Sequence, residues 1–248
     1  MDPVRVSFLG TGDAFSPAGR HQAGYLVQGN GTAFLLDCGS SALTAMKRDG
    51  IDPTALDTIL ISHLHGDHFA GLPYFFLQYT YETPRRRPLH IAGPPGTEER
   101  VRALFRATYR ELAGKVLPFP LVFTEMPPGV SLEVGAVRIE PFRVPHQETD
   151  VSLGLRVSVA QRTVLYSGDT GWTEDLVRRS QGVDLFICEC CYFETRVDFH
   201  LDYPRLAEHR HRFGAKRMVL THLGREVLAH CNDITIDLAT DGLVVEVE

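Results

Sequence analysis

The sequence lacks any run of the roughly 18 consecutive apolar residues that a membrane-spanning helix needs. Its first residues, MDPVRVSFLGTG, begin with an acidic residue, and the apolar run that follows is too short for a signal peptide. Cysteine is scarce: there are five, an odd number, and Cys190 and Cys191 are adjacent. A disulfide framework does not suit this arrangement, so we expect a reducing, cytoplasmic compartment and no membrane association.

An excess of basic charge is also missing. Lys and Arg number 25 against 31 Asp and Glu, which gives a net charge of −6. This balance argues against a protein that coats nucleic acid non-specifically. No Gly-x-Gly-x-x-Gly stretch opens a helix and no Gly-Lys-Ser/Thr motif occurs. Both absences argue against a dinucleotide-binding fold and a P-loop nucleotidase.

The chain has 248 residues, 44% of them hydrophobic, and shows no repeat and no linker-like stretch, so we expect one domain, 1–248. Groups of strands alternate with helices, which favours two β-rich halves with flanking helices. We predict strands at Val4–Gly10, Gly24–Gln28, Thr32–Asp37, Thr58–Ser62, Leu89–Ala92, Leu121–Glu125, Val130–Val134, Val137–Val144, Leu153–Val159, Thr163–Ser167, Leu185–Glu189, Met218–Thr221, Ile234–Leu238 and Leu243–Val247. Helices are predicted at Ser41–Arg48, Phe69–Thr80, Thr97–Leu112, Trp172–Arg179 and Tyr203–Phe213.

Histidines gather in the hexapeptide His63-Leu64-His65-Gly66-Asp67-His68, which follows an apolar strand. It holds four residues of metal-ligand type within six positions, in a mixture of imidazole and carboxylate that suits zinc, with iron or manganese as alternatives. Side chains at successive loop positions point in different directions. The loop can therefore serve two metal ions, with His63 and His65 on one and Asp67 and His68 on the other.

Three further ligand types stand where a predicted strand meets a loop, a common address for functional sites in sheet proteins. His146 follows the strand that ends at Val144, Asp169 follows Ser167-Gly168, and His222 follows Met218–Thr221. A strand-end Asp is usually a turn residue and a lone His is usually structural. Beside the hexapeptide, however, these three residues are the candidates to complete two metal sites.

The order of these motifs resembles the metallo-β-lactamase-fold hydrolase superfamily. The resemblance runs through Leu36-Asp37-Cys38-Gly39, the histidine loop, His146, Ser167-Gly168-Asp169-Thr170 and Thr221-His222. It implies an α/β fold, an αβ/βα four-layer sandwich with two mixed β-sheets flanked by helices. It also implies His63, His65 and His146 on one metal, Asp67, His68 and His222 on the other, and Asp169 bridging both. Asp37 would hold the histidine loop by hydrogen bonds, or else cap the helix at Ser41.

Local sequence resembles the ribonuclease Z branch of phosphodiesterases. The resemblance lies in Phe8–Gly12, Gly71-Leu72-Pro73, Ala92–Gly96, and Glu189 followed by His200. One departure is the interval from His146 to Asp169. It has 23 positions, room for one hairpin, whereas in ribonuclease Z it resembles a longer interval that holds an arm gripping tRNA.

The resemblance implies a hydrolase with two zinc ions, or manganese or iron, that cleaves a small or nucleotide-like phosphodiester through a metal-bridging hydroxide. RNA is a less favoured substrate because the arm is missing, and a homodimer is compatible with the resemblance. The alternatives are a carboxylic ester or lactone hydrolase with the same metals, and a metal-dependent sensor or binding protein without turnover.

Asp67, Glu189 and His200 are the residues expected to carry catalysis. His200 is the candidate general acid, oriented and kept cationic by Glu189. A structural Glu–Arg pair with a surface His200 is the alternative. Gly10–Asp13 forms either a phosphate-binding turn or a simple strand-to-loop turn. The arginines at 85–87 and at 102, 106 and 110 form either a basic ridge for a polynucleotide or a solvated surface.

Overall fold

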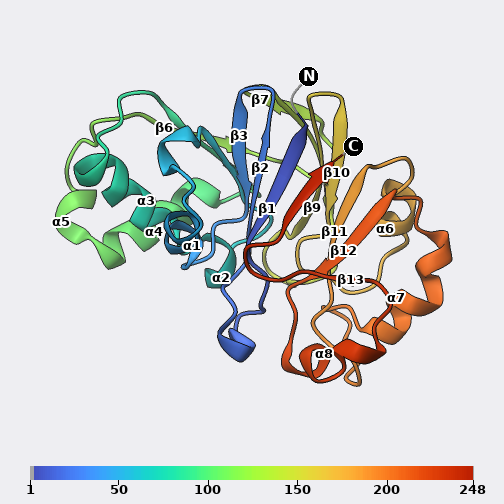
Figure 1. Ribbon diagram of the computed structural model, residues 1–248. Coiled ribbons are helices and arrows are strands. Elements are labelled where there is room, and N and C mark those ends of the chain that lie inside the picture. The colour runs from blue at the N-terminus through green and yellow to red at the C-terminus, as the bar shows by residue number, and fades with distance from the viewer. Residues whose placement is uncertain (1–2, 248) are drawn as a thin grey trace.

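The computed structural model describes residues 3–247, so positions 1, 2 and 248 of the expected domain lie outside the described residues. Two seven-stranded sheets form the centre of the molecule (Figure 1). The first sheet has the order β14 (Val244–Val247), β1 (Val4–Gly10), β2 (Gly24–Gly29), β3 (Thr32–Leu36), β4 (Thr58–Leu60), β5 (Leu89–Gly93) and β6 (Leu121–Glu125). The second has the order β13 (Asp237–Leu238), β12 (Arg217–Thr221), β11 (Leu185–Glu189), β10 (Arg162–Tyr166), β9 (Leu153–Val159), β8 (Val137–Arg143) and β7 (Leu132–Val134).

Both sheets are mixed. In the first, strands β14 to β3 pair antiparallel, and β3 to β6 pair parallel. In the second, β7 to β10 pair antiparallel, and β10 to β13 pair parallel. A tight hairpin joins β2 and β3, with Asn30 and Gly31 at φ 50° and 74° in its turn. Positive φ at both positions is what a tight two-residue hairpin turn requires.

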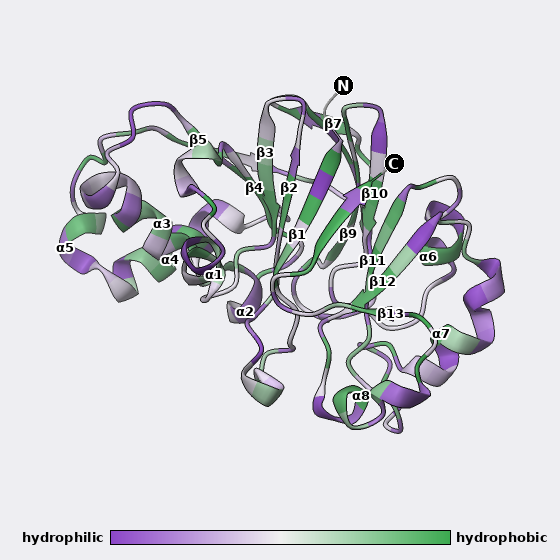
Figure 2. Cartoon of the chain, in the orientation of Figure 1, coloured by the Kyte–Doolittle hydropathy of each residue, from purple (hydrophilic) through white to green (hydrophobic). Residues whose placement is uncertain are grey.

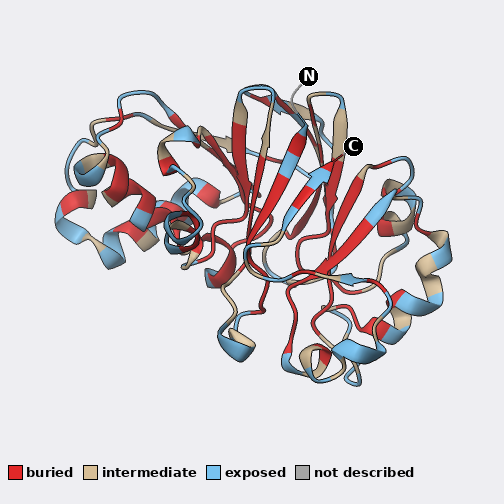
Figure 3. Ribbon diagram, viewed as in Figure 1, coloured by how far each residue is buried: buried red, intermediate tan, exposed pale blue. Residues whose placement is uncertain are grey.

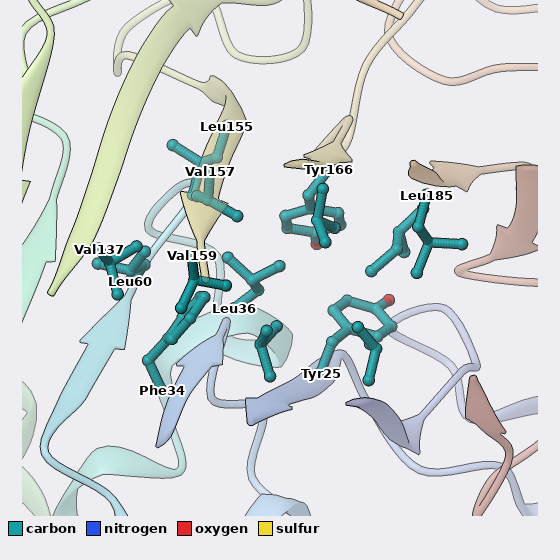
Figure 4. Packing of buried hydrophobic residues seen from close by; sticks show 14 of the residues in the cluster. Tyr25, Phe34, Leu36, Leu60, Val137, Leu155, Val157, Val159, Tyr166 and Leu185 are labelled. Carbon is teal, nitrogen blue, oxygen red and sulfur yellow. The ribbon is translucent and has the colours of Figure 1, made fainter. Parts of the chain in front are cut away.

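Apolar side chains from the facing sides of the two sheets form the central core. Tyr25, Phe34 and Leu36 of the first sheet pack against Val157 and Tyr166 of the second (Figure 4). The strands are largely green with some purple bands in the hydropathy view and mostly red in the burial view, since the central strands are covered on both faces (Figures 2 and 3). Because successive side chains on a strand point to opposite faces, every second residue lies on the outer face of its sheet, and the apolar ones there need another layer to bury them.

Helices supply that cover and complete four layers. On the first sheet lie α1 (Ala42–Arg48), α3 (Leu72–Leu77) and α4 (Thr97–Thr108), packed on residues such as Leu35 and Ile59. On the second lie α6 (Glu174–Arg179), α7 (Tyr203–His209) and α8 (Arg225–Ala229), packed on Phe186 and Leu220. The predicted αβ/βα sandwich is confirmed. No helix within residues 3–247 has the length and apolar character needed to cross a bilayer.

Two predicted helices are wrong in extent. The segment predicted as Phe69–Thr80 forms α2 (Gly66–Phe69), α3 and a π-helical turn at Gln78–Glu82. The segment Thr97–Leu112 forms α4 and a separate α5 (Arg110–Ala113), because Tyr109 takes non-helical angles of φ −136° and ψ 63°. The cap of α4 is Gly96, while the Thr97 hydroxyl donates to the Pro94 carbonyl. Helix α8 was not predicted.

Short 3-10 turns complete the regular structure, at Pro17–Gly19, Pro53–Ala55, Arg210–Arg212 and Cys231–Asp233. The turn at Arg210–Arg212 continues α7 within the predicted Tyr203–Phe213 helix.

Candidate metal centre

The predicted ligands follow the carboxyl ends of strands from both sheets. His63 and His65 come after β4, and Asp67 and His68 lie in α2, at the lower edge of the sheets in Figure 1. His146, Asp169 and His222 follow β8, β10 and β12. Parallel pairing of β3 with β4 and of β10 with β11 and β12 brings these strand ends to one edge. Four separate segments of the chain therefore meet there.

Three histidine nitrogens converge in the first ligand group, His63, His65, His146 and Asp169. His65 Nδ1 lies 3.1 Å from His63 Nε2 and 3.0 Å from His146 Nε2. Asp169 Oδ2 is 3.8 Å from each of those Nε2 atoms. Burial lowers the pKa of His63, and it also lowers the pKa of His65 and of His146. Neutral imidazoles are the form that binds a metal, so these lone pairs suit a cation.

The second ligand group consists of Asp67, His68, Asp169 and His222, and it is almost entirely buried. Asp67 Oδ2 lies 3.2 Å from His68 Nε2 and 3.4 Å from His222 Nε2. Asp169 Oδ2 lies 3.3 Å and 3.2 Å from the same two nitrogens. Asp169 thus belongs to both groups. Burial alone would raise the pKa of Asp169, but His222 and His68 hold it well below its usual range, so the carboxylate is ionised.

Unpartnered buried atoms show that these residues suit metal ions. His68 Nε2, Asp169 Oδ1 and His222 Nδ1 are buried and have no hydrogen-bond partner. An unpaired buried polar atom costs roughly 1–3 kcal/mol, so such atoms are rare in folded proteins. A cation in this cluster of imidazoles and carboxylates would supply the missing interactions of His68 Nε2 and Asp169 Oδ1, while His222 faces the same group through its Nε2. The donor set of nitrogen and carboxylate oxygen is one that zinc, iron and manganese accept.

Asp37 supports the ligands from behind. Its Oδ2 accepts hydrogen bonds from His68 Nδ1 at 2.7 Å, the Ser62 hydroxyl at 2.7 Å and the Tyr166 hydroxyl at 2.6 Å. Its Oδ1 accepts from the Ser62 backbone N–H at 2.7 Å. Because His68 Nδ1 donates to this carboxylate, Nε2 is the nitrogen left to face a metal. Asp37 therefore has the contacts expected of it, and it does not cap the helix at Ser41, which makes no side-chain cap.

Backbone strain is concentrated at the same edge. Asp37 and His222 have φ values of 57° and 52°, in the left-handed region that side chains with a Cβ rarely adopt. Gly168, next to Asp169, has φ 59°, and a Cβ there would lie 2.5 Å from the Leu153 carbonyl oxygen. Glycine is thus required at position 168, so that the turn can direct Asp169 into the site.

Glu189 and His200 form a pair beside the ligands. His200 Nδ1 lies 2.8 Å from Glu189 Oε1, and the Glu189 carboxylate is fully buried. The backbone N–H groups of Thr170, Cys191 and Leu201 also donate to it. Burial alone would lower the pKa of His200, but the Glu189 carboxylate raises it to about 9. The alternative of a Glu–Arg pair with a surface His200 is wrong, since Glu189 binds His200 and His200 is largely buried.

A cavity of about 540 Å³ opens onto this centre. It is lined by five of the predicted ligands and His200, by Asp13 of the predicted turn and by Cys191 of the adjacent cysteine pair. The lining residues that sequence reasoning missed are Ala14, Phe15, Gln147, Glu148, Thr149, Tyr192 and Phe199. The sequence indicated a turn at Gly10–Asp13, but nothing in its pattern related that turn to His146. The Cys191 sulfur lies 3.8 Å from Asp13 Oδ2 and belongs to a third ligand-type group with His200 and His222.

Two hypotheses about phosphate and polynucleotide binding lose their support. In the Gly10–Asp13 turn, the N–H of Thr11 donates to Asp241 and that of Gly12 to His21, so these amides are engaged within the chain. Among the arginines, Arg85 is buried and bound to Asp57. Arg87 also pairs with Asp57, and Arg102 pairs with Glu98. The basic ridge considered as one alternative is further interrupted because Arg110 lies in a separate helix.

Comparisons with known proteins agree with this geometry. The chain is 29% identical over 238 residues to a ribonuclease Z of Mycobacterium sp. (strain KMS), covering 88% of this chain and 84% of that protein. The short form of human tRNase Z superposes with a TM-score of 0.80 at 25% identity, over 98% of this chain and 99% of that one. The metallo-β-lactamase-fold protein YhfI of Bacillus subtilis also reaches 0.80, at 23% identity, over 99% and 100%.

The chain is therefore a metal-dependent hydrolase of the metallo-β-lactamase fold, similar to ribonuclease Z. A family model described as "Anti-Pycsar protein Apyc1" matches residues 4–241, which is nearly the whole sequence. The chain belongs to this Apyc1 anti-Pycsar family.

Proposed function

We propose that this chain is a dinuclear phosphodiesterase that acts on a small or nucleotide-like phosphodiester. The observation that carries the proposal is the pair of ligand groups that share Asp169. His63, His65 and His146 would hold one cation and Asp67, His68 and His222 the other, with zinc as the first choice and manganese or iron as alternatives. When bound, such a pair supplies Lewis acidity and a water of lowered pKa.

His200 is the group we propose as proton donor. Its Nδ1 is taken by Glu189, so Nε2 is the nitrogen available to a substrate in the cavity that His200 lines. A cationic imidazole can donate a proton from Nε2 to a leaving oxygen. Glu189 keeps the ring oriented, because three backbone amides and His200 together satisfy both carboxylate oxygens.

The charge of the cavity and the short interval between His146 and Asp169 support a small substrate over a long RNA. Among the described residues that line the cavity, none is Lys or Arg, so a polyanion finds no cationic groove there. The interval from His146 to Asp169 holds a loop and the β9–β10 hairpin. Although the relatives are named as ribonucleases, we rank RNA below a small diester as the substrate of this chain for these two reasons.

The family description supplies a biological role for the proposal. We extend the anti-Pycsar role to this chain, with phosphodiester hydrolysis as the chemistry by which it would act. We also propose a reducing, cytoplasmic compartment, which is supported by five cysteines that are all free thiols, four of them buried.

A comparison of ester substrates tests the function. Protein loaded with zinc or manganese should cleave bis-(p-nitrophenyl) phosphate far faster than p-nitrophenyl acetate or a lactone. The reverse order would favour the carboxylic ester hydrolase, and no turnover of any ester would favour the metal-dependent sensor.

Replacing a ligand tests the assignment of the metals. Asp67→Ala should retain about one metal ion per chain by elemental analysis and lose phosphodiesterase activity by roughly 100-fold or more. The matched control is Asp237→Ala, an exposed Asp that pairs with Arg217 on the surface. Full activity and two metal ions in Asp67→Ala would contradict the assignment.

A further inference from the structure

Two exposed phenyl rings stand at the mouth of the metal-centre cavity. Phe15 is 87% exposed and Phe199 is 47% exposed. Both line the same cavity as His146, His200 and the other ligands, although they lie far apart in the sequence. Ligand-binding cavities are lined predominantly by apolar and aromatic side chains, so these two rings are candidates for contact with a ligand. Phenyl rings, unlike aliphatic chains, offer flat faces to that ligand.

The loop that carries Phe15 is held in place by hydrogen bonds. Asp13, which is buried, accepts from the Phe15 backbone N–H at 2.8 Å. At the base of the loop, Gly12 forms a bridge with Leu223, the residue after the ligand His222. At the tip, Ser16 and Ala18 have φ values of 51° and 55°. Left-handed angles at two non-glycine residues cost free energy, so the surrounding contacts fix the backbone of this loop and with it the backbone position of Phe15.

Phe199 is tied directly to the metal centre. Its carbonyl oxygen lies 2.9 Å from His146 Nδ1, which donates to it. Its ring centre is 5.4 Å from that of His200 and 6.5 Å from that of His146. The phenyl group therefore stands next to both a proposed ligand and the proposed proton donor. A substrate whose phosphate reaches the ligands would bring its adjoining group to this ring.

The chemistry of the cavity indicates what that adjoining group is. Since no described Lys or Arg lines the cavity, binding energy beyond the phosphate must come from contacts other than salt bridges. A nucleobase has two π-faces, and stacking of a base on an aromatic side chain is independent of charge. We propose that Phe15 and Phe199 stack the base of a nucleoside phosphodiester, and so select nucleotides over other diesters. This inference rests on the proposed phosphodiesterase function.

Two substrates with the same leaving group test the selection: thymidine 5′-(p-nitrophenyl phosphate) and methyl p-nitrophenyl phosphate. The ratio of their kcat/KM values measures the contribution of the nucleoside. Phe15→Ala should lower this ratio roughly tenfold, chiefly through KM of the thymidine ester, and Phe15→Tyr should restore it. Tyr81→Ala is the matched control, because Tyr81 is an aromatic residue 67% exposed that does not line the cavity. An unchanged ratio in both Phe15→Ala and Phe199→Ala would overturn the proposal.

A binding measurement separates this inference from the proposed function. Phe15→Trp places a fluorophore at the cavity mouth, and its emission should be quenched by thymidine 5′-monophosphate but not by ribose 5-phosphate. Wild-type protein, with Trp172 alone, provides the baseline. Equal responses to the two ligands, or none, would overturn base stacking even if diesters are hydrolysed. Selective quenching without diester hydrolysis would support the stacking site and reject the phosphodiesterase.

Discussion

At the scale of single residues, the metal centre depends on how the imidazole nitrogens are oriented. His65 Nδ1 is within 3.1 Å of two other imidazole nitrogens, closer than neutral rings approach without a shared proton or cation. The side chains hold this arrangement because three of the rings are anchored on their far side. Ser62 contacts His63, Asp37 contacts His68, and the Phe199 carbonyl contacts His146. Orientation of the ligands is therefore built into the protein through these partners.

Asp37→Asn tests this support. Asp37 accepts hydrogen bonds at both oxygens, so either orientation of the amide places an NH₂ group against a donor. We expect metal affinity to fall about 10- to 100-fold. A titration of the metal-free protein against a chelator of known affinity measures the change.

Asp49→Asn is the control for this substitution, because Asp49 pairs with Arg48 at the surface, away from the ligands. If Asp37→Asn bound metal as tightly as Asp49→Asn, the role of Asp37 in orienting His68 would be wrong.

At the scale of elements, a loop–helix contact organises the approach to His200. Glu226, in the first turn of α8, accepts hydrogen bonds from three successive backbone N–H groups, those of Phe193, Glu194 and Thr195, and from the Thr195 hydroxyl. The segment it grips continues to Phe199 and His200. The two ends of this loop are also paired, because Tyr192 and Asp202 form a β-bridge. One carboxylate thus orders a segment that lacks regular structure of its own.

The pKa of Glu226 makes this contact measurable. Burial alone would raise that pKa, but the Thr195 hydroxyl and the three amides lower it to about 2. Because the folded-state pKa is depressed, the contact stabilises the fold fully above pH 4.5 and loses its effect as the pH falls towards 2. Glu226→Gln should therefore lower Tm at pH 7 by roughly 2 °C, with the difference from wild type shrinking between pH 4.5 and 3.

Thermal melts of metal-free protein across this pH range measure the difference, and the comparison with wild type cancels titration of the metal ligands. Glu133→Gln, an exposed position on β7, serves as the control and should show no such trend. A constant difference at all pH values would contradict the link between Glu226 and the loop.

At the scale of the whole molecule, the proposed metals join the two sheets. The histidine loop belongs to the first sheet, whereas His146, Asp169 and His222 follow strands of the second. Cations held between them would add cross-links to the apolar core that the sheets already share. Because the unfolded chain lacks this site, metal binding would stabilise the folded state in proportion to its free energy of binding.

Calorimetry with and without metal tests this coupling and the proposed single domain, 1–248. We expect one cooperative transition, which removal of the metals shifts downward by roughly 10 °C when free metal had been 1,000-fold above its Kd. Asp169→Ala, which loses the residue common to both groups, should melt near the metal-free temperature under either condition. Two separate transitions would contradict a single domain.

The sequence by itself determined the chemistry and most strands. The hexapeptide from His63 to His68 is local, so its ligand types and their alternation are visible without any long-range contact. Strands such as Val137–Arg143 follow from alternating apolar residues, because one face of each strand must meet the core. The resemblance in motif order then indicated the correct four-layer fold.

Only the tertiary structure decided which segments meet at the site. Phe15, Tyr192 and Phe199 carry no local signal, and they line one cavity because the order of strands brings their loops to the same edge. The break at Tyr109 and the use of the Thr11 amide by Asp241 likewise depend on packing between distant residues. Periodicity in a sequence reports which face of an element is buried. The neighbours of that face are fixed by sheet order and close packing, which no local pattern encodes.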